Sequence, residues 1–288
     1  MLNKALLALL VVALVTMACG ITIDLPFTQE KIGPTQIEDI HVPLLEPGSG
    51  TAEVTIAFGA GLLNIDSGSD DALIDGTATF NVADIGPEIT IEGEEVRLEQ
   101  GNLDLTSIPT FSDGMVNTWD LEFADVPMEL LINAGAYSGR LELGGLSLER
   151  LEINDGASDV RVEFSQANHT EMSLFRYTTG ASNLTLEGLA NANCSEFVFR
   201  SGAGSYTLDF SGELSRDMLV SIESGVSSVT IIMPEGASAI LNTSGGLLTV
   251  NSTGAWHQDG SRYTVSGDGY TITIDVDMGA GNLVLETR

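Results

Sequence analysis

The chain has 288 residues, with 41 Asp and Glu against 11 Lys and Arg, and a formal net charge of −30. This length allows one large domain or two ordinary ones, each with an ample core. The acidic excess argues against nucleic-acid binding, because phosphate groups require a basic face. Hydrophobic residues make up 43% of the chain, which is typical of a folded protein and not of a disordered acidic tail.

Residues 1–18 predict a lipoprotein signal peptide. Lys4 is followed by an apolar run that ends at Ala18, and Cys19 and Gly20 come next. A charged start, an apolar centre and a small residue before the cleavage point are typical of a secretory signal. The segment Val15-Thr16-Met17-Ala18-Cys19 resembles the bacterial lipobox, in which the cysteine receives a diacylglyceryl group. The alternative is an ordinary secretory signal followed by a chance cysteine.

Lipidation of Cys19 predicts an exported protein on the extracytoplasmic face of a bacterial membrane or at the cell surface. Residues 19–50 follow the predicted signal and hold four prolines, at positions 26, 34, 43 and 47. We interpret residues 19–50 as a tether or an N-terminal cap.

The mature chain contains a repeated phrase, apolar-x-apolar-x-x-Gly-(Ala/Val)-x-x-apolar-x-apolar. Period-two alternation on both sides of the glycine predicts two half-buried strands, and the glycine allows a bend between them. In one copy, at Gly135, we interpret Tyr137-Ser138 as a two-residue insertion. The glycines of the seven copies are Gly59, Gly135, Gly156, Gly180, Gly202, Gly225 and Gly279.

The spacing of the repeats predicts the fold class. From Gly135 the glycines follow at 21, 24, 22 and 23 residues, which is typical of a solenoid whose repeats stack on their neighbours. A β-sandwich would place turns about 8–12 residues apart. We therefore predict an all-β fold, a β-solenoid (β-helix) of about 22-residue two-strand repeats. No substantial helix is expected after the signal peptide.

Two regions follow the tether. Residues 51–130 are a less regular β region, and residues 131–288 are the predicted solenoid. Phe58-Gly-Ala-Gly-Leu-Leu-Asn-Ile65, Asn117-Thr-Trp119 and Val126-Pro127 resemble the toast-rack N-terminal family, a bacterial domain of unknown function. Residues 270–283 are similar to the C-terminal domain of LiaF-type cell-wall-active antibiotic response proteins. The resemblance implies a β-helix on the cell exterior, adhesin-like, without a known catalytic site.

Candidate catalytic and metal-binding residues are few. His41, His169 and His257 lie far apart and lack metal-ligand spacing, so we interpret them as surface or turn residues. Neither a Gly-x-Ser-x-Gly motif nor a phosphate-binding loop occurs. We expect no cofactor and no catalytic residue. Cys194 has no neighbouring histidine and is interpreted as a small buried hydrophobe.

Acidic side chains are the remaining candidates. Asp66, Asp70 and Asp71 offer oxygen ligands in one loop, so they form a candidate calcium site; a solvated acidic turn is the alternative. Four acidic residues each lie seven positions after a repeat glycine, so stacking predicts one outward column. Arg161, Arg176 and Arg200 lie on nearby strands and would relieve repulsion within it. The four are Glu163, Glu187, Asp209 and Glu286.

The leading functional hypothesis is a non-enzymatic, lipid-anchored surface protein that presents an acidic β-solenoid as a binding or adhesin-like scaffold. Its expected partners are the membrane, through the anchor, and a cell-wall polymer or envelope protein. One alternative is an accessory or sensor in the envelope stress response. A carbohydrate-active β-helix enzyme that uses Glu163 or Glu187 is another.

Overall fold

The computed structural model describes residues 32–46, 48, 50–101 and 114–288, and this part of the chain is all-β. Its only helical elements are two short 3-10 helices, η1 (Ala83–Ile85) and η2 (Leu189–Ala192). Fifteen strands form one continuous open sheet. The strands are β1 (Gln36–Pro43), β2 (Ala52–Ser69), β3 (Ala72–Phe80), β4 (Pro87–Glu92), β5 (Glu95–Gln100), β6 (Asn117–Ala124), β7 (Pro127–Glu142), β8 (Ser147–Glu163), β9 (Leu174–Glu187), β10 (Glu196–Asp209), β11 (Met218–Met233), β12 (Ser238–Ser252), β13 (His257–Asp259), β14 (Arg262–Val265) and β15 (Thr271–Thr287).

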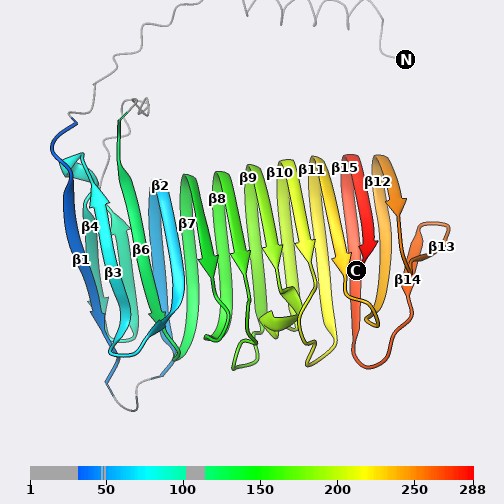
Figure 1. Cartoon of the computed structure of the whole chain (residues 1–288), viewed down its shortest axis with the longest axis horizontal. Helices are drawn as coiled ribbons and strands as arrows, with labels where there is room; N and C mark the ends of the chain where they lie inside the picture. The colour runs from blue at the N-terminus through cyan, green and yellow to red at the C-terminus, as the bar shows by residue number, and fades with distance from the viewer. Residues whose placement is uncertain (1–31, 47, 49, 102–113) are drawn as a thin grey trace, which may run out of the picture.

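The long central strands give the sheet a solenoid-like form. Figure 1 shows each of them bending back on itself, so that it has a first arm before its glycine and a second arm after it. The first arms form one layer and the second arms form the other. In β8, Leu151 and Ile153 of the first arm and Val160 and Val162 of the second arm are all buried. The apolar face of each arm therefore points into one shared core, as the period-two pattern predicted.

Glycine at the bend is required by close stacking of neighbouring strands. A Cβ atom added to Gly180 would lie 2.4 Å from the carbonyl oxygen of Gly156 in the neighbouring strand. Non-bonded carbon and oxygen atoms do not approach this closely, so the corner of β9 excludes any larger residue. The same stacking explains why the repeated phrase has a glycine at this position.

Most long strands stack in parallel and in chain order, from β2 through β7, β8, β9 and β10 to β11. Phe197, for example, lies in register with Phe175 of β9 and Val220 of β11. The order then changes, because β15 lies between β11 and β12 and is parallel to both. The last segment of the chain is therefore inside the stack, and β12 is the last long strand (Figure 1).

The two layers are extended differently at the N-terminal end. The first arm of β2 pairs with β5, which pairs with β4, whereas the second arm continues through β6 and β3 to β1. Part of the predicted tether or cap thus forms an edge strand, β1, with Ile40 and Val42 buried. Both β3 and β4 lie within residues 51–130, the region predicted to be less regular β structure.

The predicted insertion at Tyr137-Ser138 is wrong. Pairing between β7 and β8 runs without interruption from Ala136–Ala157 to Glu142–Glu163. The apparent insertion arises because Gly139 replaces an apolar residue of the pattern, opposite Leu63 and Val160. A Cβ atom on Gly139 would lie 1.9 Å from the carbonyl oxygen of Leu63, so a larger residue is excluded there.

Candidate binding faces

A column of carboxylates runs across the outer face of the second arms. Glu142 of β7, Glu163 of β8 and Glu187 of β9 lie in register. Asp209 of β10 follows, since the preceding residues Leu208 and Leu186 are paired. The column is interrupted at Ile232 of β11 and resumes at Glu286 of β15. The predicted carboxylates therefore do share one column, with one apolar residue within it.

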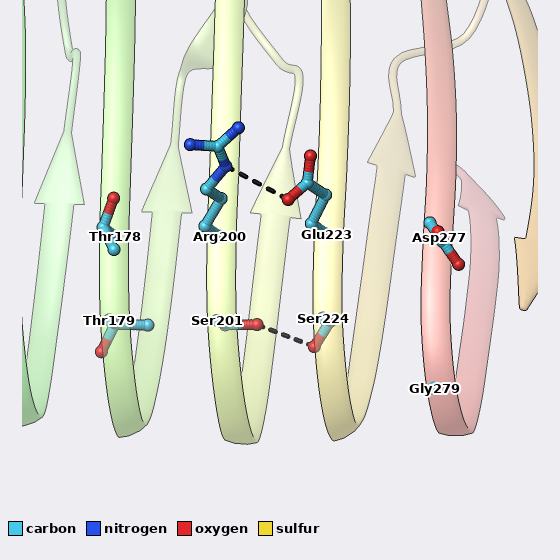
Figure 2. A pocket seen from close by; sticks show the side chains of 8 residues that line it. All are labelled: Thr178, Thr179, Arg200, Ser201, Glu223, Ser224, Asp277 and Gly279. Carbon is cyan, nitrogen blue, oxygen red and sulfur yellow. Dashed lines mark hydrogen bonds and ion pairs between the residues drawn. The ribbon is translucent and has the colours of Figure 1, made fainter.

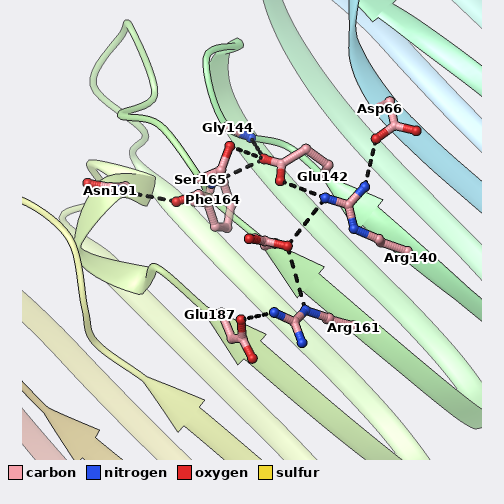
Figure 3. Close-up of polar contacts among 10 residues, drawn as sticks. Asp66, Arg140, Glu142, Gly144, Arg161, Phe164, Ser165, Glu187 and Asn191 are labelled. Carbon is pink, nitrogen blue, oxygen red and sulfur yellow. Dashed lines mark hydrogen bonds and ion pairs between the residues drawn. The ribbon is translucent and has the colours of Figure 1, made fainter. Parts of the chain in front are cut away.

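Two arginines neutralise the first half of this column (Figure 3). The guanidinium of Arg140 contacts the carboxylates of Asp66 at 2.9 Å, Glu142 at 3.2 Å and Glu163 at 3.3 Å. Arg161 pairs with Glu163 at 3.6 Å and with Glu187. Because cations alternate with carboxylates, like charges on adjacent strands are separated by an opposite charge. Of the arginines predicted for this role, Arg176 and Arg200 instead pair with Glu152 and Glu223 on the first arms.

Glu142 differs from the other carboxylates of the column because it is 8% exposed. Its Oε1 accepts hydrogen bonds from the backbone amide of Gly144 at 2.8 Å, and from the amide and hydroxyl of Ser165 at 3.1 and 3.0 Å. A buried carboxylate is stable only when such donors surround it. Glu142 therefore holds together the loops that follow β7 and β8, and it is not available to a ligand.

Replacement of Arg161 by glutamine is expected to lower the free energy of unfolding by about 1 kcal/mol or less, because the pair is half exposed. The loss arises from unrelieved repulsion between Glu163 and Glu187, so it should shrink at high salt. Urea unfolding at 20 mM and 500 mM NaCl measures both effects. Arg97→Gln on β5, with a side chain as exposed as that of Arg161, removes the same charge outside the column and serves as the control; equal losses in the two variants would contradict the role of Arg161.

The candidate calcium ligands are not gathered around one point. Asp66 lies in β2 and pairs with Arg140, whereas Asp70 and Asp71 are exposed in the bend between β2 and β3. Across the part of the chain that the structure describes, no group of three or more His, Cys, Asp or Glu is arranged to hold a metal ion. His41, His169 and His257 are exposed on separate segments.

A shallow groove of about 550 Å³ crosses the outer face of the first arms, over β9, β10, β11 and β15 (Figure 2). Arg200 and Glu223 form an ion pair at 3.2 Å in its centre, and Asp277 lies in register with Glu223 on the next strand. Ser201 and Ser224 share a hydrogen bond of 2.7 Å near the corner. The groove therefore offers one row with the hydroxyl of Thr178, a guanidinium and two carboxylates, beside a second row of hydroxyls at the corner.

The groove could not be recognised in the sequence, because Thr178 and Asp277 are about one hundred residues apart and meet only through the insertion of β15.

A second polar cluster, at the corner of β8, was also missed. The carboxylate of Asp155 accepts hydrogen bonds from Ser158 at 3.0 Å and Tyr177 at 2.6 Å. Burial raises the pKa of Tyr177 well above its usual value, so the phenol remains a hydrogen-bond donor.

Cys194, Asn168 and Asn193 have structural roles. Cys194 is 1% exposed, and burial raises the pKa of its thiol to about 12, as expected for an unreactive core cysteine. The Asn168 side chain accepts a hydrogen bond from the backbone amide of Leu148 and donates one to its carbonyl, both at 2.8 Å. Asn193 adopts a left-handed conformation, φ 53°. Cys19, the predicted lipidation site, lies outside the described residues.

Comparison of the sequence with family models identifies one match. Residues 31–176, just over half of the chain, match the N-terminal domain of toast_rack, a domain of unknown function. The chain belongs to this family. The matched region of this toast-rack protein contains β1 to β8, the carboxylates from Asp66 to Glu163 and both arginines that pair with them. It ends before the groove, and the likeness of the C-terminal end to LiaF-type proteins stays a prediction.

A search of solved structures found matches of low sequence identity. A candidate cell adhesion protein from Clostridium sporogenes is 18% identical, with a TM-score of 0.47 over 88% of this chain and 100% of that one. A candidate adhesin from Bacteroides fragilis is 9% identical, with a TM-score of 0.37 over 90% and 99% of the two chains. These likenesses carry no conclusion about function. A search of curated protein sequences found no match.

Proposed function

We propose that this toast-rack protein is a non-catalytic, lipid-anchored surface scaffold that binds a cell-wall polymer. The single observation that carries the proposal is the groove over β9, β10, β11 and β15. Its row of one hydroxyl and three charged groups lies across the strands, on a stack of strands joined by continuous hydrogen bonding. A rigid face needs little reordering when it binds an extended chain, so less entropy is lost on association.

The chemistry of the groove favours a polar, hydroxyl-rich ligand. Thr178, Arg200 and Asp277 supply donors and acceptors in one row, and such groups pair with the hydroxyls and charged groups of a polysaccharide. The net charge of −30 further favours a ligand that carries cationic groups over an anionic one. An envelope protein is the alternative ligand, and the binding experiment separates the two.

Anchoring depends on Cys19 in this proposal. In a bacterial host that processes lipoproteins, Cys19→Ala should move the protein from the membrane fraction to the soluble extracytoplasmic fraction, because the acyl attachment is lost. Cell fractionation followed by immunoblotting measures the distribution. Cys194→Ala is the matched control and should leave the protein in the membrane fraction. An uncleaved apolar segment 2–18 would also hold the variant in the membrane, so mass spectrometry of the N-terminal peptide of the unaltered protein decides: a Cys19 without a diacylglyceryl group excludes the lipid anchor. Within the described residues, no helix has the length and apolar character for crossing a membrane.

Binding through the groove predicts that Arg200→Ala weakens association with purified cell-wall polysaccharide about tenfold, or about 1.4 kcal/mol. A sedimentation assay with insoluble wall material measures the bound fraction. Arg97→Ala removes a similarly exposed arginine, paired with Glu99 on β5, and should bind like the unaltered protein. Failure of the unaltered protein to bind any wall fraction, with capture of an envelope protein instead, would contradict a polymer ligand.

A further inference from the structure

The C-terminal end of the stack has an unpaired strand edge. The second arm of β12, residues 247–252, pairs with β15 on one side. On its other side, no strand among the described residues pairs with it. The first arm of the same strand is covered, because Ala239–Asn242 pair with β14, which pairs with β13. The first-arm layer therefore ends two strands later than the second-arm layer, and the end of the stack is stepped.

The core is incompletely covered at this step. Leu248 and Val250 point toward the core but are only partly buried, whereas Leu283, the neighbour of Val250 in β15, is completely buried. Trp256 also packs against the core and is partly exposed, and Leu247 is 82% exposed at the corner. Unpaired backbone groups beside exposed apolar side chains are a template for pairing with another strand.

The charge distribution indicates which strand fits there. No Asp, Glu, Lys or Arg occurs between Glu235 and Asp259, although the chain contains 52 such residues, 41 acidic and 11 basic. The edge strands at the other end are acidic, since β1 contains Glu38 and Asp39 and β4 contains Glu88 and Glu92. A second copy of this chain also has a net charge of −30. Two copies therefore repel each other least when they approach through the ends that lack charged residues.

We propose that two copies of this chain associate tail to tail, each covering the free edge of the other's β12. A two-fold axis parallel to the strands places the longer layer of one copy beside the shorter layer of the other. The step of each end is then filled by the β13–β14 hairpin of its partner, and the same surface is used twice. The charges on this hairpin compensate each other, because Asp259 and Arg262 lie in register. The inference depends on the fold alone and not on the proposed ligand.

Sedimentation equilibrium of the purified chain from residue 20, which keeps every described strand, tests this association. We expect a dimer whose dissociation constant falls as NaCl rises from 20 to 500 mM, because screening weakens the repulsion between the acidic bodies. Thr249→Glu, an exposed residue on the free edge, should weaken the dimer at least tenfold. Ser205→Glu adds the same charge to exposed β10 in the middle of the stack and should leave the dissociation constant unchanged.

Three results would overturn the proposal. One is a monomer at 100 µM protein in 500 mM NaCl, and another is a dimer that Thr249→Glu and Ser205→Glu weaken equally. The third is growth into long chains, since these would require the N-terminal edges as well. Circular dichroism spectra and melting curves of both variants show whether they fold like the unaltered protein. Wall binding by a strictly monomeric chain would leave the proposed function intact and contradict only the association.

Discussion

Phe197→Ala is expected to lower the free energy of unfolding by about 3–5 kcal/mol, which is the largest effect of any single side-chain truncation that we predict. Phe197 is completely buried at the centre of the stack. Its ring centroid lies 4.8 Å from that of Phe175 and 6.5 Å from those of Phe199 and Phe210. Removing the ring leaves a cavity between three strands that are held in place by their hydrogen bonds, so the surroundings cannot close it.

Equilibrium unfolding in guanidinium chloride measures this loss. Leu219→Ala on the neighbouring strand β11 is the control, because the Leu219 side chain is 61% exposed and lies outside the core. We expect the control to change the free energy of unfolding by less than about 0.5 kcal/mol. A loss below 1 kcal/mol for Phe197→Ala would mean that the aromatic residues do not form a packed column inside the stack.

Gly180→Ala is expected to destabilise the protein by about 2–3 kcal/mol, although it adds a single methyl group. The added Cβ atom would lie 2.4 Å from the carbonyl oxygen of Gly156. Relief of this clash requires β8 and β9 to separate at the corner, where both arms of each strand are fixed by pairing with their neighbours.

The matched control is Gly50→Ala, because a Cβ atom at Gly50 meets no atom within 4 Å and its φ lies outside the left-handed region. The melting temperatures of the two variants compare the effect of a methyl group at a crowded corner with its effect at an open position. We expect Gly50→Ala to be neutral or slightly stabilising, since alanine restricts the unfolded chain more than glycine does. Equal melting temperatures for the two variants would contradict the close stacking of the corners.

The core could be predicted from the sequence because every arm uses the same alternation. Phe175, Tyr177, Leu184 and Leu186 all occur at apolar positions of the repeated phrase, and all are buried. The carboxylate column followed from the same argument, since residues at one offset from the glycine must share a face. Such predictions need only local periodicity, which is read within one repeat.

The order of the strands could not be predicted, because every repeat has the same apolar alternation. Ile274 and Val276 of β15 have the apolar pattern of every other copy, so they fit beside Val220 and Ile222 of β11 as well as beside any neighbour. A pattern that all repeats share does not specify which repeats touch. The groove and the free edge of β12 both depend on the insertion of β15, so neither was visible in the sequence.

Of the three arginines predicted to neutralise the carboxylate column, Arg161 does so, whereas Arg176 and Arg200 do not, and Arg140 was missed. Arg176 precedes its corner glycine and therefore lies on the first arms, whereas Arg140 follows Gly135 and lies on the second arms with the carboxylates. The misread insertion at Tyr137-Ser138 obscured the register of Arg140. Counting Arg140 from its glycine, without an insertion, would have placed it correctly.

In-cell photo-crosslinking from Thr178 most directly tests the central proposal, that the groove is the binding site of a surface scaffold. A photoreactive residue at Thr178 lies at the groove, and the same residue at Ser205 lies on the outer face of the second arms as a control. We predict that position 178 captures cell-wall polymer and that position 205 captures far less. Capture of a membrane kinase or its regulator from position 178, with no wall material, would contradict the scaffold and favour a role in envelope stress signalling.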